Sequence, residues 1–156
     1  MVRICCIRLL VVLLALVTQG HARDLPSAPA SAAQGTIDQA RAAIDKQDWA
    51  GARTRLTEAL AEDPASADVH NLLGYLYRKQ PERDLAKAFL HYRLALGFDP
   101  RHRGAHEYIG EAYLQENRLA DAMRHLEALE AICGNRTCEE YADLSAAITR
   151  YRENRR

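Results

Sequence analysis

The dipeptide Asp-Pro occurs at residues 63–64 and again at 99–100, a separation of 36 residues. A fixed period of this length marks a chain built from repeated supersecondary units, and such units bury their apolar faces only by stacking on one another. The repeat therefore constrains the fold more than any other feature of the sequence. Aligning the two prolines superimposes four further pairs: His70 and His106, Leu73 and Ile109, Gly74 and Gly110, and Tyr77 and Tyr113.

The second half of each unit repeats as well. Ala88-x3-Tyr92-x2-Ala95 aligns with Ala122-x3-Leu126-x2-Leu129 at a spacing of 34, because the turn at 79–82 is two residues longer in the earlier unit. A third, degenerate copy reads Ala52-x3-Leu56-x2-Ala59. Apolar residues within each half recur at helical intervals, and the proline that closes each unit cannot continue a helix. Each unit is therefore predicted to be a pair of helices.

The composition from residue 36 onward favours helices, since Ala, Leu, Glu and Arg dominate and β-branched residues are few. Glycine within a helix costs about 1 kcal/mol relative to alanine, so a glycine at the same place in two units predicts the close approach of a neighbouring helix, with Ala88 or Ala122 as its small partner. An apolar stripe over 138–151 predicts a final helix that caps the array. The expected helices are 36–46, 50–62, 66–79, 84–97, 102–115, 119–132 and 138–151.

The first 22 residues have the layout of a secretory signal peptide: two arginines, an apolar run over 9–17, and small residues at Gly20 and Ala22. A spanning helix needs about 20 apolar residues, which this run does not supply. We expect cleavage after Ala22, leaving no stable membrane anchor. The Ala- and Arg-rich composition is typical of a bacterial chain, so the predicted location is the periplasm. Residues 23–35, rich in Pro, Ala and Ser, are expected to form a flexible leader.

Cleavage would leave two cysteines, Cys133 and Cys138, between the last repeat helix and the cap. An even pair in an exported protein favours a disulfide, here a structural one that ties the cap to the last repeat. A redox pair would more typically be Cys-x-x-Cys at the start of a helix.

The chain has 21 basic and 21 acidic residues, and this balanced charge argues against a general nucleic-acid binder. It carries no nucleophile elbow, phosphate-binding loop, dinucleotide-binding glycine motif or zinc-protease motif. The sequence predicts neither an enzyme nor a cofactor.

The repeated motifs resemble the tetratricopeptide repeat. The residues that carry the resemblance are Leu73-Gly74-x2-Tyr77, Ala88-x3-Tyr92-x2-Ala95 and Pro100, then Ile109-Gly110-x2-Tyr113 and Ala122-x3-Leu126. The resemblance departs from the family at the first copy, which lacks the Leu-Gly-Tyr signature. It implies an all-α, right-handed solenoid of helical hairpins, with repeats at about 36–64, 67–100 and 103–132 and a C-terminal capping helix, within a domain over 36–152.

The resemblance also implies a function: a non-catalytic adaptor or scaffold of the cell envelope that binds a protein or peptide segment in a concave groove. The groove is lined in this family by the first helix of each pair. By position, the residues expected to face the partner are Asn71, Tyr75, Arg78, Lys79, Glu107, Glu111, Leu114 and Gln115.

Two other functions are compatible with the sequence. His102 and His106 lie four residues apart, the minimal spacing for two imidazoles on one metal, so a metal-handling or redox accessory protein that uses them with Cys133 and Cys138 is the alternative. No third ligand is evident, and packing between helices is the simpler role for these histidines. A subunit docked permanently into an envelope complex through its cap or convex face is the third candidate.

Overall fold

A computed structural model describes residues 32–156, and the predicted signal peptide and most of the predicted leader lie outside this range. The described residues form seven helices and no strand, as expected for an all-α repeat array. No helix among them is both long enough and apolar enough to cross a bilayer. The helices are α1 (Ala32–Asp45), α2 (Trp49–Glu62), α3 (Ala67–Lys79), α4 (Leu85–Phe98), α5 (Arg103–Gln115), α6 (Leu119–Cys133) and α7 (Glu139–Glu153).

Six of the seven helices begin and end within two residues of the predicted positions, and α1 is the exception. It begins at Ala32, four residues earlier than expected, and so takes up the end of the predicted leader. The side chain of Gln34 donates a hydrogen bond of 3.2 Å to Asp38, one turn further on. Such a pair at i, i+4 supports a helix, and alanine has the highest helix propensity, so this alanine-rich segment extends the helix.

Side chains of the repeat set where the helices begin. Asp48, Ser66 and Asp84 precede α2, α3 and α4, and each accepts a hydrogen bond from a backbone N–H of the first turn. These caps satisfy donors that have no partner inside the helix. At the start of α5 the capping acceptor is Nδ1 of His102, 3.1 Å from the amide nitrogen of Ala105.

The turns within the hairpins show that the first copy is a full member of the array. Gln47 between α1 and α2 has φ 58°, and Asn117 between α5 and α6 has φ 62°. Because few residues other than glycine adopt a positive φ, the shared conformation at the same place marks the same turn. The turn between α3 and α4, which carries the two-residue insertion, has no such residue.

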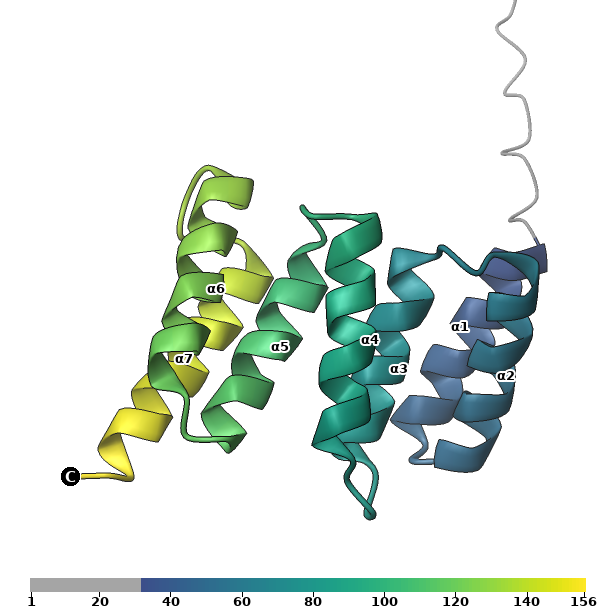
Figure 1. Ribbon diagram of the computed structural model, residues 1–156, viewed down its shortest axis with the longest axis horizontal. Coiled ribbons are helices and arrows are strands. Elements are labelled where there is room, and N and C mark those ends of the chain that lie inside the picture. The colour runs from purple at the N-terminus through teal and green to yellow at the C-terminus, as the bar shows by residue number, and fades with distance from the viewer. Residues whose placement is uncertain (1–31) are drawn as a thin grey trace, which may run out of the picture.

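The hairpins α1/α2, α3/α4 and α5/α6 stack side by side in chain order, and α7 closes the C-terminal end (Figure 1). The first helices touch in succession, α1 to α3, α3 to α5 and α5 to α7. Among the described elements, α2, α4 and α6 do not contact one another. When one row of helices is packed more closely than the other, the array bends toward the closely packed row. The odd-numbered helices form that row and therefore line the concave side.

The repeated glycines do mark close approaches, but the predicted small partners, Ala88 and Ala122, are wrong. A Cβ on Gly74 would lie 2.5 Å from the ring of Tyr92, which is fully buried. A Cβ on Gly110 would lie 2.7 Å from a terminal methyl of Leu144 in α7. Each glycine thus makes room for a large side chain, one from within its own hairpin and one from the cap.

The last helix covers the apolar edge of the third hairpin. Leu144 and Ile148 of α7 are buried and pack with Leu114, Ala122 and Leu129. The open end of a solenoid would otherwise expose the face that a further repeat would cover. The capping role predicted for this helix is confirmed.

Candidate functional site

The concave side carries two neighbouring hollows between α1 and α3. They measure about 440 and 260 Å³ and share Ile44, Asp45 and Tyr75. Three aromatic rings line them in total, those of Trp49, Tyr75 and Tyr108. Apolar walls beside a few polar groups are typical of a surface that holds another molecule. The other lining residues are Arg41, Gln47, Leu72, Lys79 and Pro81.

A third concave hollow, of about 290 Å³, lies between α5 and α7. Its walls combine apolar and charged side chains: Arg78, Glu111, Leu114, Gln115, Ala147, Arg150 and Tyr151. Arg150 is exposed and forms no ion pair within the described residues, so a positive charge is available at this end of the concave side.

Between the two groups of hollows lies a buried arginine. Arg78 is 3% exposed, and its NH1 lies 2.7 Å from a carboxylate oxygen of Glu111. Its Nε donates to the hydroxyl of Tyr92 at 3.1 Å. The guanidinium carbon also lies 5.5 Å from the ring centres of both Tyr75 and Tyr108. Four contacts from α3, α4 and α5 thus hold this cation, and they tie the second hairpin to the third.

The predicted groove residues fall into two sets. Asn71, Arg78, Glu107 and Leu114 are buried, at 6%, 3%, 8% and 9% exposure, and form the floor beneath the concave side. Tyr75 and Lys79 line the hollows between α1 and α3, and Glu111 and Gln115 line the hollow between α5 and α7, where Arg78 and Leu114 also form part of the wall. That all eight face a partner stays a prediction, and the polar atoms of Arg78 are already engaged within the array.

Two polar groups in the floor have no partner in the described part of the chain. The buried Oδ1 of Asn71 accepts no hydrogen bond. Glu107 forms no hydrogen bond or ion pair, and burial, together with the charges of Glu111 and Asp143, raises its pKa to about 8. A carboxyl group in this position is largely protonated and uncharged at neutral pH.

Several concave residues were missed by the sequence reasoning. Trp49, Ile44 and Arg41 belong to the degenerate first copy, where the absent Leu-Gly-Tyr signature left no register from which to assign positions. Arg150 and Tyr151 belong to the cap, which was expected only to cover the last repeat. The apolar periodicity of the first copy and of the capping helix could have pointed to these residues, because it also identifies the helix face next to the buried stripe.

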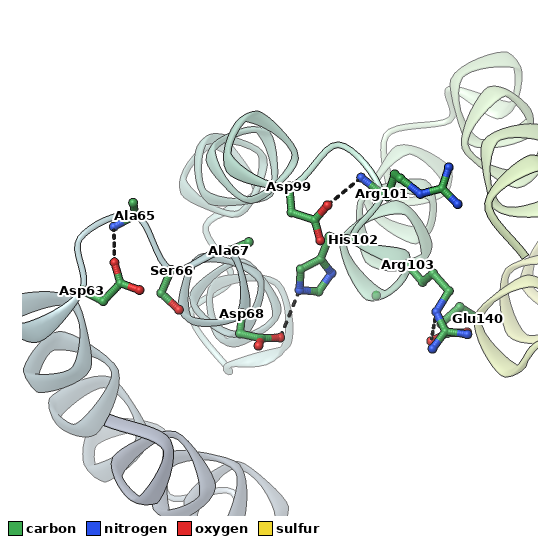
Figure 2. Close-up of a pocket in the computed structure, with 11 residues that line it drawn as sticks. Asp63, Ala65, Ser66, Ala67, Asp68, Asp99, Arg101, His102, Arg103 and Glu140 are labelled. Atoms are coloured by element: carbon green, nitrogen blue, oxygen red, sulfur yellow. Dashed lines mark hydrogen bonds and ion pairs between the residues drawn. The ribbon is translucent and has the colours of Figure 1, made fainter. Parts of the chain in front are cut away.

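A larger hollow, about 560 Å³, lies at the edge where α3 and α5 begin. Figure 2 shows that its charged groups are engaged with one another or with the backbone. Asp68 receives a hydrogen bond of 3.2 Å from Nε2 of His102, which lowers the pKa of that carboxyl, and Arg103 pairs with Glu140 at 3.4 Å. Asp63 and Asp99 accept backbone N–H groups of the turns that follow them. These contacts fix the loops between the hairpins.

The histidines form pairs that the sequence did not predict. In the second hairpin, Nε2 of His70 donates to the carbonyl of Pro64 at 3.1 Å. In the neutral ring its Nδ1 is therefore the acceptor, and it accepts a hydrogen bond from the Nδ1–H of His91, 3.0 Å away. Burial and the neighbouring His70 lower the pKa of His91 to about 4.

The same arrangement recurs in the third hairpin. Nδ1 of His106 lies 2.9 Å from Nδ1 of His125, and Nε2 of His106 lies 3.1 Å from the carbonyl of Pro100. Burial and His106 lower the pKa of His125 to about 4. His102 and His106, the pair considered for a metal, engage both of their ring nitrogens with different partners. They are not brought together as ligands.

The two cysteines form the expected disulfide. Cys133 ends α6 and Cys138 precedes α7, and their sulfur atoms are bonded at 2.09 Å. The carboxylate of Glu140 lies near both sulfurs, the one group of potential metal ligands found in the described part of the chain. Sulfurs joined to each other are not thiolates, so this group does not have the ligands that zinc binds. A disulfide is typical of an oxidising compartment.

Comparison with known proteins gives one family match. The sequence profile of the tetratricopeptide repeat matches residues 37–102, from within α1 through α4 to the turn that follows. No curated protein matches the chain.

Proposed function

We propose that this chain is an adaptor of the cell envelope that binds a partner segment on its concave side. The proposal is supported by the match of residues 37–102 to the tetratricopeptide repeat family, whose repeats generally mediate contacts between proteins. The adaptor brings proteins together and performs no catalysis. The predicted signal peptide and the disulfide support export, and the periplasm is the location we propose.

One observation supports the concave side as the binding surface. Three hollows lie along it, and they combine apolar walls with exposed charged groups of both signs, such as Lys79, Arg150 and Asp45. A segment bound there would bury apolar anchors in the hollows and pair its charges at their rims. Three hairpins provide a short surface, so we expect affinity in the micromolar range unless a second contact adds avidity.

Site-specific photo-crosslinking in the native envelope tests the proposal. A photoreactive amino acid is placed at Lys79 and at Gln115, which are exposed beside the concave hollows, and in control variants at Leu90 of α4 and Glu127 of α6, which are exposed on the outer row. We expect the same partner to be trapped from both concave positions and from neither control. Trapping only from the outer positions, or equally from all four, would contradict the proposal.

A further inference from the structure

The aromatic side chains that line the hollows between α1 and α3 carry three hydrogen-bond donors without partners. Trp49, Tyr75 and Tyr108 are each partly buried, and their indole N–H and hydroxyl groups form no hydrogen bond within residues 32–156. Lys79 adds an ammonium group, 5.9 Å from the ring centre of Tyr75.

The side-chain acceptors that line these hollows are the carboxylate of Asp45, the amide oxygen of Gln47 and the hydroxyl oxygens of Tyr75 and Tyr108. The remaining cation, Arg41, is already paired with Asp38 at 3.1 Å. A ligand that presents acceptors and apolar rings therefore suits the unpartnered donors and the apolar walls of these hollows.

Backbone conformation decides which kind of segment meets that requirement. A helical segment has its carbonyl groups engaged internally, so its backbone offers little to the four donors. An extended segment of ordinary residues exposes carbonyls but also an N–H at each residue, and each of those donors needs an acceptor from the hollows or from water. A proline-rich segment in the polyproline II conformation exposes free carbonyls, has no N–H at each proline, and carries apolar rings.

We infer that the aromatic hollows between α1 and α3 bind a proline-rich partner segment in the polyproline II conformation. The rings of Trp49, Tyr75 and Tyr108 receive prolyl rings, and their N–H and O–H groups donate to the carbonyls between them. This inference rests on the proposed function and specifies the chemistry of the partner at one end of the concave side.

Trp49 provides a direct readout, because it is the only tryptophan in the chain. Mature protein is titrated with an acetylated, amidated nonaproline, about 28 Å long in the polyproline II conformation, and tryptophan emission is followed. The comparison ligand is a lysine-solubilised alanine peptide of the same length. We expect a saturable change in emission with nonaproline and none, or a much weaker one, with the alanine peptide.

Variants that remove hydroxyl groups test the contacts. The double variant Tyr75→Phe/Tyr108→Phe keeps both rings and deletes both donors, so affinity for nonaproline should fall about 10-fold, as expected for the loss of about 1.4 kcal/mol of hydrogen bonding. The matched control is Tyr151→Phe, a partly buried tyrosine of the hollow between α5 and α7. Its affinity should equal that of the wild type, and unchanged thermal unfolding curves would establish that both variants are folded.

The outcomes separate this inference from the proposed function. No response of Trp49 to nonaproline, tighter binding of the alanine peptide, or equal weakening by Tyr151→Phe would overturn the inference. If the photo-crosslinks from Lys79 and Gln115 still trapped one partner, the adaptor function would stand without it. If those crosslinks failed as well, both would be wrong.

Discussion

The second and third hairpins of this protein share a pair of histidines and differ at the positions of the concave side. In both, the two histidines are hydrogen-bonded through their Nδ1 atoms, and one of them is also hydrogen-bonded to the carbonyl of the proline before the hairpin. At the concave positions the correspondence ends, since Tyr75 and Arg78 of α3 are matched by Glu111 and Leu114 of α5.

The difference teaches that repetition in the sequence identifies the fold and that its breakdown identifies the surface. Positions that contact the neighbouring helix are subject to the same packing in every unit, so the same residue is suitable each time. Exposed positions beside the hollows, such as Lys79 and Gln115, meet whatever lies outside the array, and nothing in the repeat requires them to agree. Arg78 is an exception to this division, because it is buried and contacts the next hairpin although α5 has Leu114 in its place. Five predictions test this division, from the largest expected effect to the smallest.

Giving the second hairpin the residue of the third should be the most damaging change. Arg78→Leu removes the partner of Glu111 and of the Tyr92 hydroxyl, and breaking a buried ion pair costs about 3 to 5 kcal/mol. We expect a loss of about 3 kcal/mol in the free energy of unfolding, the low end of that range, because Glu111 keeps some exposure. Chemical denaturation measures it.

A double variant supplies the control for that change. Arg78→Leu/Glu111→Gln removes the unpaired charge and should recover part of the lost stability. Arg150→Leu, at an exposed and unpaired arginine, should change stability by less than about 0.5 kcal/mol. Equal losses for Arg78→Leu and Arg150→Leu would mean that Arg78 does not join the two hairpins.

The two repeated glycines should respond unequally to the same substitution. Gly74→Ala places a methyl group against the buried ring of Tyr92, and we expect it to lower the free energy of unfolding by about 2 to 3 kcal/mol. Gly110→Ala meets the end of the flexible Leu144 side chain rather than a rigid ring, and alanine gains up to about 1 kcal/mol of helix propensity, so we expect a smaller loss there. Thermal melts of the two variants side by side would reveal the difference, and a smaller effect at Gly74 would refute the packing described.

The Cys133–Cys138 disulfide follows the third hairpin, and the second hairpin contains no cysteine. Opening the disulfide by Cys133→Ser should lower the free energy of unfolding by about 2 kcal/mol, the chain-entropy value for so short a loop. Binding to a partner trapped from Lys79 should be unaffected. If Cys133→Ser abolished that binding in a protein that still folds, the disulfide would have a role other than closing the end of the array.

The shared histidine pairs should make both hairpins sensitive to acid. His91 and His125 have lowered pKa values in the folded chain, so between about pH 6.5 and 4 the unfolded chain binds more protons and stability falls as the pH falls. Allowing for their partial exposure, we expect a loss of about 1 kcal/mol per pair at pH 4.5. Denaturation curves from pH 7 to pH 4 measure the slope, and a flat profile would contradict neutral pairs.

In the third hairpin, Glu107 makes stability depend on pH in the opposite direction to the histidines. Its raised pKa means that the folded chain holds a proton that the unfolded chain releases between about pH 4.5 and 8, so this contribution to stability is lost as the pH rises through that window. Glu107→Gln should remove this decline between about pH 4.5 and 8, so that stability rises more steeply with pH where the histidines titrate; denaturation curves over pH 4 to 8 measure the difference.

The sequence predicts the repeated features well and the unrepeated ones poorly. Helix boundaries, the stacking order and the disulfide follow from periodicity, capping residues and cysteine count, because these depend on neighbours in the chain. The partners of Gly74 and Arg78 depend on which side chains meet across helices, and a spacing alone does not give that. Trp49 went unrecognised because its copy of the repeat has lost the residues that would have placed it in register.

Hydrogen exchange of the protein with and without the photo-crosslinked partner tests the central claim most directly. The account predicts slower amide exchange on binding in the concave helices α1, α3 and α5, with α2 and α4 unchanged. Protection confined to α2, α4 and α6 would place the partner on the outer row and contradict the claim that the concave side is the binding surface.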